Sequence, residues 1–520
     1  MLQNLTLRQK IGQMIMMGFP TEKVTPELAE FLAEYKIGNI ILFTRNVATS
    51  GQLQRLCADL QENIKRNTGY TAFISVDQEG GMVARLPADA VSMPAAMAVA
   101  ATGNPKNAYL AGKITAEELR ALGINMNLAP DMDINSNPNN PVIGVRSFGD
   151  TAKTVTNFGI ALMRGLQDGG VMPVIKHFPG HGDTSVDSHL GLPKVKKTLE
   201  ELEQNELVPF KAAIREGGCG VMSSHILFPA IEKEDLPCTM SHTMLTGLLK
   251  NELGFEGLVL TDCLEMDAIQ KYYGTAKGAL AAIRAGAEIL CISHTAELVK
   301  ETVELVERAV MSGDLSENII DMAVEKILKF KLKYAEYTAG MPSNFNIGSD
   351  SHKTEIARIS EESITLVHWG NAELCVKGKK TLFVGCYANR TTLASSSVNK
   401  DFSFAAYMAK QLNGDSLITP SDPSAQDIEA VVKRAQDYEC VVFGLFNGKK
   451  NIGQVRLVNS LCRIGTEVIA VSLFNPYDLV LVDEQATKLA AYEYTILSFN
   501  TLVKIFKDEL VPQGKLSVKI

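Results

Sequence analysis

Short apolar runs alternate with longer amphipathic patterns through the first two thirds of the chain. Apolar strands without polar alternation are typical of a parallel sheet that is covered on both faces. About 300 residues of this βα repeat fit a (β/α)8 barrel. We therefore predict an α/β protein that begins with a (β/α)8 TIM-like barrel, with an open doubly wound sheet as the alternative. The runs, from Ile37 to about Lys331, are IGNIILF, TAFISVD, INMNLAP, VMPVIKH, CGVMSSH, GLVLTD and AEILCIS.

A stretch rich in Gly, Ser, Asn and Pro, EYTAGMPSNFNIGSDSH, interrupts this rhythm after Tyr334. Such a composition without apolar periodicity indicates a linker. Beyond it, the runs SITLVHW, TLFVGC, CVVFGLF and TEVIAVSLF alternate with helical patterns again. The predicted organisation is a catalytic barrel over residues 1–335, a linker over 336–354 and a smaller α/β domain over 355–520.

The composition excludes some classes of partner. The net charge of -8, without any basic tail, argues against a nucleic acid or an anionic membrane. The first residues lack the features of a signal peptide, and no run reaches the roughly 18 apolar residues of a membrane span. Nine widely spaced cysteines without a CxxC pair indicate reduced thiols. We expect a cytoplasmic protein, and its oligomeric state stays unknown at this stage.

Polar residues directly follow several of the apolar runs. The carboxyl ends of parallel strands meet at one edge of a barrel or open sheet, where ligands bind and catalytic residues gather. One or two polar residues in this position are explained simply as the first residues of loops. A larger number predicts a ligand-binding or catalytic site at this edge of the sheet. The residues in this position are Asp77, Asp131, Asp133, Lys176, His177, His225 and Asp262.

The segment KHFPGHGDTSVDSH, from Lys176 to His189, contains three of the eight histidines. Pro179 and two glycines prevent a continuous helix, so these polar groups belong on an irregular loop. Zinc ligands would need a helix or a tight knuckle to align them, and we predict no metal here. Acid–base chemistry fits better, because in Asp187-Ser188-His189 the carboxylate can accept the imidazole proton and fix its tautomer.

Three further segments contain candidate site residues. The turn Asp77-Gln-Glu-Gly-Gly, followed by Arg85, lets the backbone approach a ligand while the aspartate offers acceptors. The Pro/Asn segment NSNPNNPVIGVR ends in Arg146, whose guanidinium can bind hydroxyls. Asp262 ends its strand, whereas we interpret Glu265 as a capping or solvated carboxylate in a first helical turn.

Four segments resemble, in order, the motifs of family 3 glycoside hydrolases. The loop is similar to that of the bacterial β-N-acetylglucosaminidase branch, which acts in peptidoglycan recycling and chitin-fragment breakdown. The second half resembles the α/β sandwich domain of this family through LFNPYDL (473–479) and GKLSV (514–518), although Ser517 replaces the usual proline. The four segments are DQEGGMVARL (77–86), NLAPDMDINSNPNNPVIGVRSFG (127–149), KHFPGHGDTSVDSHLGLP (176–193) and LVLTDCLEMDAI (258–269).

The resemblance implies a retaining, exo-acting β-N-acetylglucosaminidase. Asp262 would be the nucleophile, and His189 paired with Asp187 would be the acid/base in place of the second carboxylate that is common in this chemistry. His181, Asp183 and His225 would order the surrounding loops or support the residues that contact the sugar. The residues implied to hold the sugar in the first subsite are Asp77, Arg85, Arg146, Lys176 and His177.

Other functions stay open. A neutral imidazole leaves the site less negative than a carboxylate would, so inorganic phosphate could attack the intermediate and make the enzyme a phosphorylase. A β-glucosidase would take a glutamate from the second domain, which the intact Asp187-Ser188-His189 argues against. A metal-dependent hydrolase would be sensitive to chelators, and a non-catalytic sugar-binding barrel would need no nucleophile. The expected partner is a carbohydrate, with no cofactor.

Overall fold

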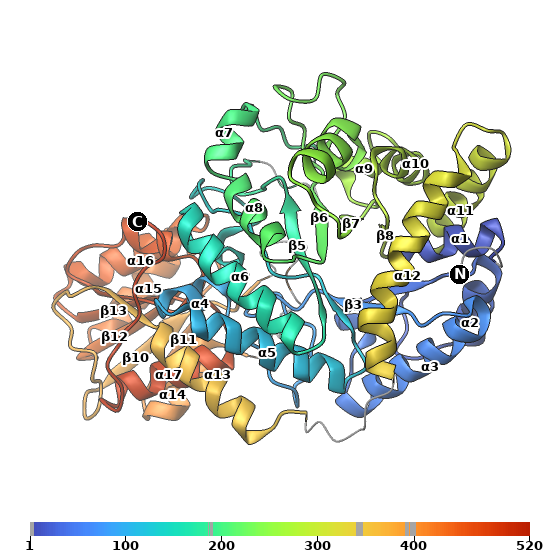
Figure 1. Cartoon of the computed structure of the whole chain (residues 1–520). Helices are drawn as coiled ribbons and strands as arrows, with labels where there is room; N and C mark the ends of the chain where they lie inside the picture. Colours follow the sequence, from blue (N-terminus) through green and yellow to red (C-terminus); the bar gives the residue numbers. More distant parts are fainter. Residues whose placement is uncertain (1–4, 186, 188–190, 340–346, 390–394, 396–401) are drawn as a thin grey trace.

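The computed structural model describes residues 5–185, 187, 191–339, 347–389, 395 and 402–520. Its first sheet is parallel throughout, with strand order β7-β6-β5-β4-β3-β2-β1-β8 (Figure 1). A bridge between Leu260 and Ile289 joins β7 to β8, so the sheet closes into a barrel. The predicted (β/α)8 barrel is confirmed. Its strands are β1 (Ile15–Met17), β2 (Asn39–Leu42), β3 (Phe73–Val76), β4 (Met126–Asn127), β5 (Met172–Phe178), β6 (Gly220–Ser223), β7 (Leu258–Thr261) and β8 (Leu290–Ile292).

Amphipathic helices pack around the outside of the barrel and bury their apolar faces against the strands (Figure 1). Local signals set their ends: the Thr49 hydroxyl accepts from the Gln52 backbone N–H at the start of α3, and Gly69 ends this helix in the left-handed conformation. The main barrel helices are α1 (Leu7–Met14), α2 (Pro26–Tyr35), α3 (Ser50–Thr68), α5 (Pro105–Ala121), α6 (Ala152–Asp168), α7 (Leu199–Gln204), α8 (Leu207–Arg215), α10 (Thr275–Ala285), α11 (Ala296–Met311) and α12 (Glu317–Ala339).

The second sheet has the order β11-β10-β12-β13-β14-β9 and is parallel except for β9. Apolar clusters lie on both of its faces, so helices, sheet and helices form three layers. This arrangement confirms the predicted smaller α/β domain. Its elements are α13 (Asp350–Ser363), β9 (Thr365–His368), β10 (Thr381–Gly385), α14 (Phe404–Leu412), β11 (Asp415–Ile418), α15 (Ala425–Ala435), β12 (Cys440–Leu445), α16 (Ile452–Arg463), β13 (Glu467–Ser472), β14 (Thr487–Ala490) and α17 (Ile496–Phe506).

The short helix α4 (Ala96–Ala101) fills the junction between the two domains and is buried along its whole length. Its Met97 belongs to the same apolar cluster as Tyr477 of the second domain. The backbone N–H of Ala95 donates to Glu493 Oε2 at 2.8 Å across this junction. The domain boundaries stay a prediction: α12 extends to Ala339 and α13 begins at Asp350, so both helices overlap the ends of the expected linker.

None of the helices in the described part of the chain is long and apolar enough to cross a membrane.

Candidate active site

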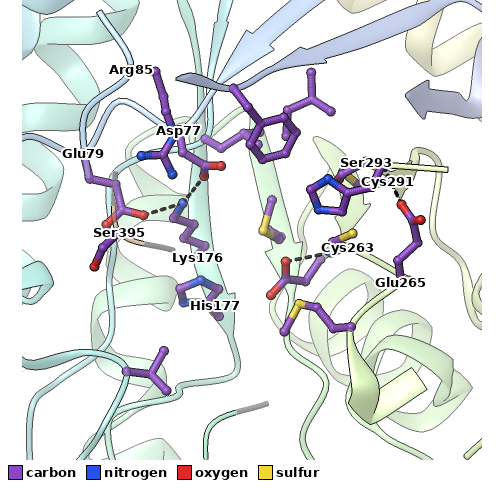
Figure 2. Close-up of a pocket in the computed structure, with 18 of the residues that line it drawn as sticks. Asp77, Glu79, Arg85, Lys176, His177, Cys263, Glu265, Cys291, Ser293 and Ser395 are labelled. Carbon is purple, nitrogen blue, oxygen red and sulfur yellow. Dashed lines mark hydrogen bonds and ion pairs between the residues drawn. The ribbon is translucent and has the colours of Figure 1, made fainter. Parts of the chain in front are cut away.

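A pocket of about 520 Å³ opens where the barrel strands end. Its lining comes mainly from β5 and from the loops that follow β2, β3, β4, β7 and β8, which is the edge predicted from the polar residues. In Figure 2, Asp77, Glu79 and Lys176 gather on one side, and Glu265 and Ser293 lie on the opposite side. A pocket of this volume at this end of a barrel is suited to a small ligand.

Lys176 is the centre of the polar side. Its buried Nζ donates to Asp77 Oδ1 and lies equally close to Glu79 Oε1, at 2.6 Å in both cases. Arg146 donates to the same Glu79 through two parallel bonds of 2.8 and 2.9 Å. Burial alone would raise the pKa of Glu79, but the charges of Arg146 and Lys176 hold that pKa well below its ordinary value. The side is therefore a fixed network of ionised groups.

Asp133 lies beneath this network, and both of its oxygens accept hydrogen bonds. Oδ2 lies 2.7 Å from His177 Nδ1, and Oδ1 accepts from the His181 backbone N–H at 2.6 Å. We assign the His177 proton to Nδ1 on the basis of this contact, which leaves Nε2 as an acceptor 3.4 Å from Arg146 Nη2. Burial and the Arg146 charge lower the pKa of His177 to about 4, so the imidazole is neutral near pH 7.

Asp131, Asp133 and His177 form a group whose potential metal-ligand atoms lie within 4.8 Å of one another. Their atoms are largely engaged already. Asp131 Oδ1 accepts from the Asp133 backbone N–H at 2.8 Å, and Asp131 Oδ2 lies 3.8 Å from Arg146 Nε. Burial, with the neighbouring Asp133 charge, raises the pKa of Asp131 well above its ordinary value. Arg146 thus offsets part of the negative charge of these carboxylates, and the chemistry below requires no metal ligand from them.

Part of the loop after β5 packs against the barrel. Gly182 has no room for a side chain, because a Cβ there would lie 1.6 Å from the Ile134 carbonyl oxygen. His181 is buried with Nδ1 2.8 Å from Thr184 Oγ1, and Asp183 pairs with Lys197 at 2.9 Å. These contacts hold the first part of the loop in place, and the role of His181 and Asp183 in ordering it stays a prediction.

The two predicted acid–base residues, Asp187 and His189, come later in the sequence of the same segment. Asp187 is half-buried, and its carbonyl oxygen accepts from the Gly191 backbone N–H at 3.1 Å. The predicted partner His189 lies outside the described residues.

Asp262 follows β7 and lines the pocket. The Cys263 backbone N–H donates to Asp262 Oδ1 at 2.7 Å and orients the carboxylate. Behind it, His225 Nε2 lies 3.0 Å from the Cys263 carbonyl oxygen, and His225 Nδ1 lies 2.8 Å from Thr239 Oγ1. His225 therefore braces the backbone beside Asp262, which agrees with an ordering role.

Several pocket residues were missed by the sequence reasoning. Glu79 stands two positions after Asp77, and this close spacing to a strand end was the available signal. Arg45 and His294 follow β2 and β8 in the same way, whereas Ser395 comes from the second domain without any local motif. The interpretation of Glu265 is corrected: it lines the pocket, and its carboxylate accepts from the His294 backbone N–H at 2.6 Å.

The pocket offers closely spaced charged donors and acceptors that suit the hydroxyl groups of a sugar ring. It also contains Asp262, a carboxylate of the kind that attacks the anomeric carbon of a sugar. On a (β/α)8 barrel, this fold and site define a glycoside hydrolase. The chain belongs to glycosyl hydrolase family 3, because residues 6–330 match the N-terminal domain of that family.

Known relatives agree with this assignment. The chain is 33% identical over 402 residues to Beta-hexosaminidase A of Pseudoalteromonas piscicida, a match covering 70% of this chain and 67% of that protein. It is 35% identical over 293 residues to a Beta-hexosaminidase of Methylococcus capsulatus, covering 56% of this chain and 85% of that protein. A family 3 β-N-acetylglucosaminidase from Paenibacillus sp. str. FPU-7 superposes with a TM-score of 0.93 at 37% identity over 99% of both chains. The predicted family and enzyme class are confirmed.

Proposed function

We propose that the protein is a retaining, exo-acting β-N-acetylglucosaminidase that removes terminal N-acetylglucosamine from β-linked glycans such as peptidoglycan or chitin fragments. The observation that carries the proposal is the presence of Asp262 in the same pocket as the paired network of Asp77, Glu79, Lys176 and Arg146. The similarity to proteins named for hexosaminidase activity supports the choice of sugar.

Asp262 is the proposed nucleophile. Its carboxylate attacks the anomeric carbon, the bond to the leaving oxygen breaks, and a glycosyl-enzyme intermediate forms. Water then attacks the same carbon and releases Asp262, so the product keeps the β configuration. The bond from the Cys263 N–H supports this role because it fixes the direction of the carboxylate before substrate binds.

His189 and Asp187 are the proposed acid/base pair. The imidazole gives a proton to the leaving oxygen in the first step and accepts one from water in the second. Asp187 stands two residues earlier, where its carboxylate can hold the imidazole in the required tautomer.

Asp77, Arg85, Arg146, Lys176 and His177 are the proposed sugar-binding residues. Charged donors and acceptors form the stronger hydrogen bonds to hydroxyl groups, and Lys176 and Asp77 offer one of each within 2.6 Å. Their mutual pairing keeps them in place without ligand, which reduces the entropy lost on binding.

The first test is nitrophenol release from p-nitrophenyl N-acetyl-β-glucosaminide, compared with the β-glucoside, with and without phosphate. We expect a strong preference for the acetylated sugar. If only the glucoside reacts, the β-glucosidase alternative is correct and His189 is not the acid/base. A glycosyl phosphate product would make the protein a phosphorylase, and inactivity on both sugars would support a binding-only barrel.

The Asp262→Asn substitution tests the nucleophile. We expect kcat to fall by on the order of 10⁴-fold, because loss of a covalent nucleophile removes the main reaction path. The matched control is Asp59→Asn on the exposed face of α3, which we expect to retain full activity. Activity of Asp262→Asn within tenfold of the parent protein would contradict the assignment, provided that both variants have the same Tm.

A further inference from the structure

The side of the pocket opposite Lys176 contains Arg45, whose guanidinium forms hydrogen bonds only to uncharged groups among the described residues. Arg45 follows β2 in the short turn η2 (Thr44–Asn46) and lines the pocket. Its Nε donates to the Phe19 carbonyl oxygen at 2.9 Å and its Nη2 to the Ser293 carbonyl oxygen at 2.7 Å, while Nη1 lies 3.1 Å from His294 Nδ1. Among the described residues, Arg45 forms no ion pair with a carboxylate.

Arg146, on the other side of the same pocket, shows the contrast. Its guanidinium is balanced by the carboxylate of Glu79 through two hydrogen bonds. Burial lowers the pKa of Arg45. The negative charge of Glu265 opposes this shift but only partly offsets it. A half-buried guanidinium without an ion pair is partly desolvated, and an anion that binds beside it would balance its charge. At the wall of a binding pocket, such an anion would be a ligand.

The guanidinium retains the capacity to bind such an anion. An arginine side chain has five N–H donors, and the three contacts described above use three of them. One N–H on Nη1 and one on Nη2 are left, a number that matches two oxygens of a carboxylate or phosphate.

The position of Arg45 is fixed before any ligand arrives. The Phe43 ring lies 4.4 Å from the guanidinium carbon, and Gly18 has no side chain, so Arg45 and Ser293 can approach its backbone closely. A preformed site of this kind loses little entropy when it binds.

The anion would occupy the leaving-group side, an inference that rests on the proposed function. If the sugar that is transferred lies on the network of Lys176 and Asp77, the bond that is cut lies near Asp262. The leaving group then extends toward the opposite side, where Figure 2 places Ser293 and Glu265. We propose that Arg45 binds a carboxylate or phosphate group on the leaving-group side of the pocket.

Two sources supply this chemistry. The first is a leaving sugar that bears a carboxylate, such as N-acetylmuramic acid, and the second is inorganic phosphate acting as the acceptor. The test compares the disaccharide N-acetylglucosaminyl-β-1,4-N-acetylmuramic acid with the same disaccharide amidated at its carboxylate. A parallel assay follows hydrolysis of the amidated form with and without inorganic phosphate.

The first variant is Arg45→Met, which keeps an apolar side chain against Phe43. The second is Arg45→Lys, which keeps the positive charge but not the paired N–H donors of the guanidinium. Arg55→Met on the exposed face of α3 is the matched control. We expect the parent to prefer the carboxylate-bearing disaccharide in kcat/KM by roughly 10- to 100-fold, the range for a hydrogen bond to a charged group. Arg45→Met should abolish this preference while retaining activity on the amidated form, and Arg45→Lys should retain part of it.

A phosphate-dependent sugar phosphate product that is lost in Arg45→Met would assign the site to phosphate instead. If neither the carboxylate nor phosphate changes the rate, or if both effects survive in Arg45→Met, the proposal is wrong. Calorimetric titration of free N-acetylmuramic acid and of phosphate separates this inference from the proposed function, because binding needs no turnover. Absence of any difference in binding between the parent and Arg45→Met would overturn the inference even if the protein cleaved no N-acetylglucosaminide.

Discussion

The two ends of the barrel each enclose one fully buried lysine, and their surroundings differ. At the carboxyl end, Lys176 lies 2.6 Å from two carboxylates, which raise its pKa against the opposing effect of burial. At the amino end, Lys331 of α12 donates to Gln13 Oε1 at 2.6 Å and to the Gly38 carbonyl oxygen at 2.8 Å. With only neutral partners among the described residues, burial lowers the pKa of Lys331 to about 7.

This difference separates two uses of a buried charge. The carboxyl end holds Lys176 and Arg146 with matching carboxylates, so these two cations are ordered before any ligand binds. The other end uses a lysine as a hydrogen-bond donor that joins the last barrel helix to the segments before β1 and β2, and its charge is expendable. The following substitutions test this distinction.

Lys176→Met should have the largest effect. It removes a donor that we propose binds the sugar, and it leaves the buried carboxylate of Glu79 with Arg146 as its remaining partner. We expect kcat/KM to fall by at least about 10³-fold and the free energy of unfolding to fall by roughly 3–5 kcal/mol, as for a broken buried ion pair. Urea unfolding and steady-state kinetics measure both quantities. A loss of stability below 1 kcal/mol would show that the network is not tightly coupled.

Asp133→Asn tests whether the pocket at the carboxyl end of the barrel needs the two acceptor oxygens of Asp133, which contact His177 and His181. The amide keeps the size of the side chain but can accept at only one of the two atoms that now contact His177 and His181. We expect KM to rise by roughly tenfold with a smaller change in kcat, because the His177 imidazole, which we propose binds the sugar, loses its fixed tautomer. Asp235→Asn, on an exposed loop, is the control. A change in kcat alone would argue against a positioning role.

Lys331→Met tests the other end through the pH dependence of stability. The pKa of Lys331 is lowered in the folded protein to about 7 from an ordinary value of 10.5, so between these values the unfolded chain holds a proton that the folded chain lacks. The stability of the parent should therefore gain up to about 2 kcal/mol from this group as the pH rises from 7 to 9.

In Lys331→Met this contribution should be absent, although the variant also loses two hydrogen bonds and has lower stability overall. Urea unfolding at several pH values, with Lys329→Met on the same helix as the control, measures the difference in slope. Equal slopes in the parent and in Lys331→Met would mean that Lys331 stays charged when buried.

Ser395→Ala should have the smallest effect. Ser395 is the described pocket residue that the second domain supplies, and Figure 2 places it beside Glu79. Loss of one neutral hydrogen bond to a sugar would raise KM by roughly 2- to 10-fold. Ser416→Ala on the exposed strand β11 is the control. An unchanged KM would show that Ser395 does not contact the substrate.

The sequence predicted those features that local patterns encode. Apolar runs gave the strands β2 to β8, and the polar residues that end them, such as Asp77, Lys176 and Asp262, do line one pocket. β1 was missed because its three buried residues continue the apolar pattern of α1 without a break. Arg45 follows the strand β2 closely, and this spacing was a local signal that the sequence reasoning did not use. Ser395 was missed because only the docking of the second domain brings it to the pocket, and no local pattern carries that information.

The buried helix α4 has a consequence for how this chain can be divided. A Beta-hexosaminidase of Methylococcus capsulatus is matched over 85% of its length by 56% of this chain, so that protein is shorter than this chain. A version of this chain that ended after α12 would expose Met97 and the alanines around it. This apolar patch would then favour aggregation. A single-domain descendant of this enzyme would therefore need polar replacements on α4 before, not after, the loss of its second domain.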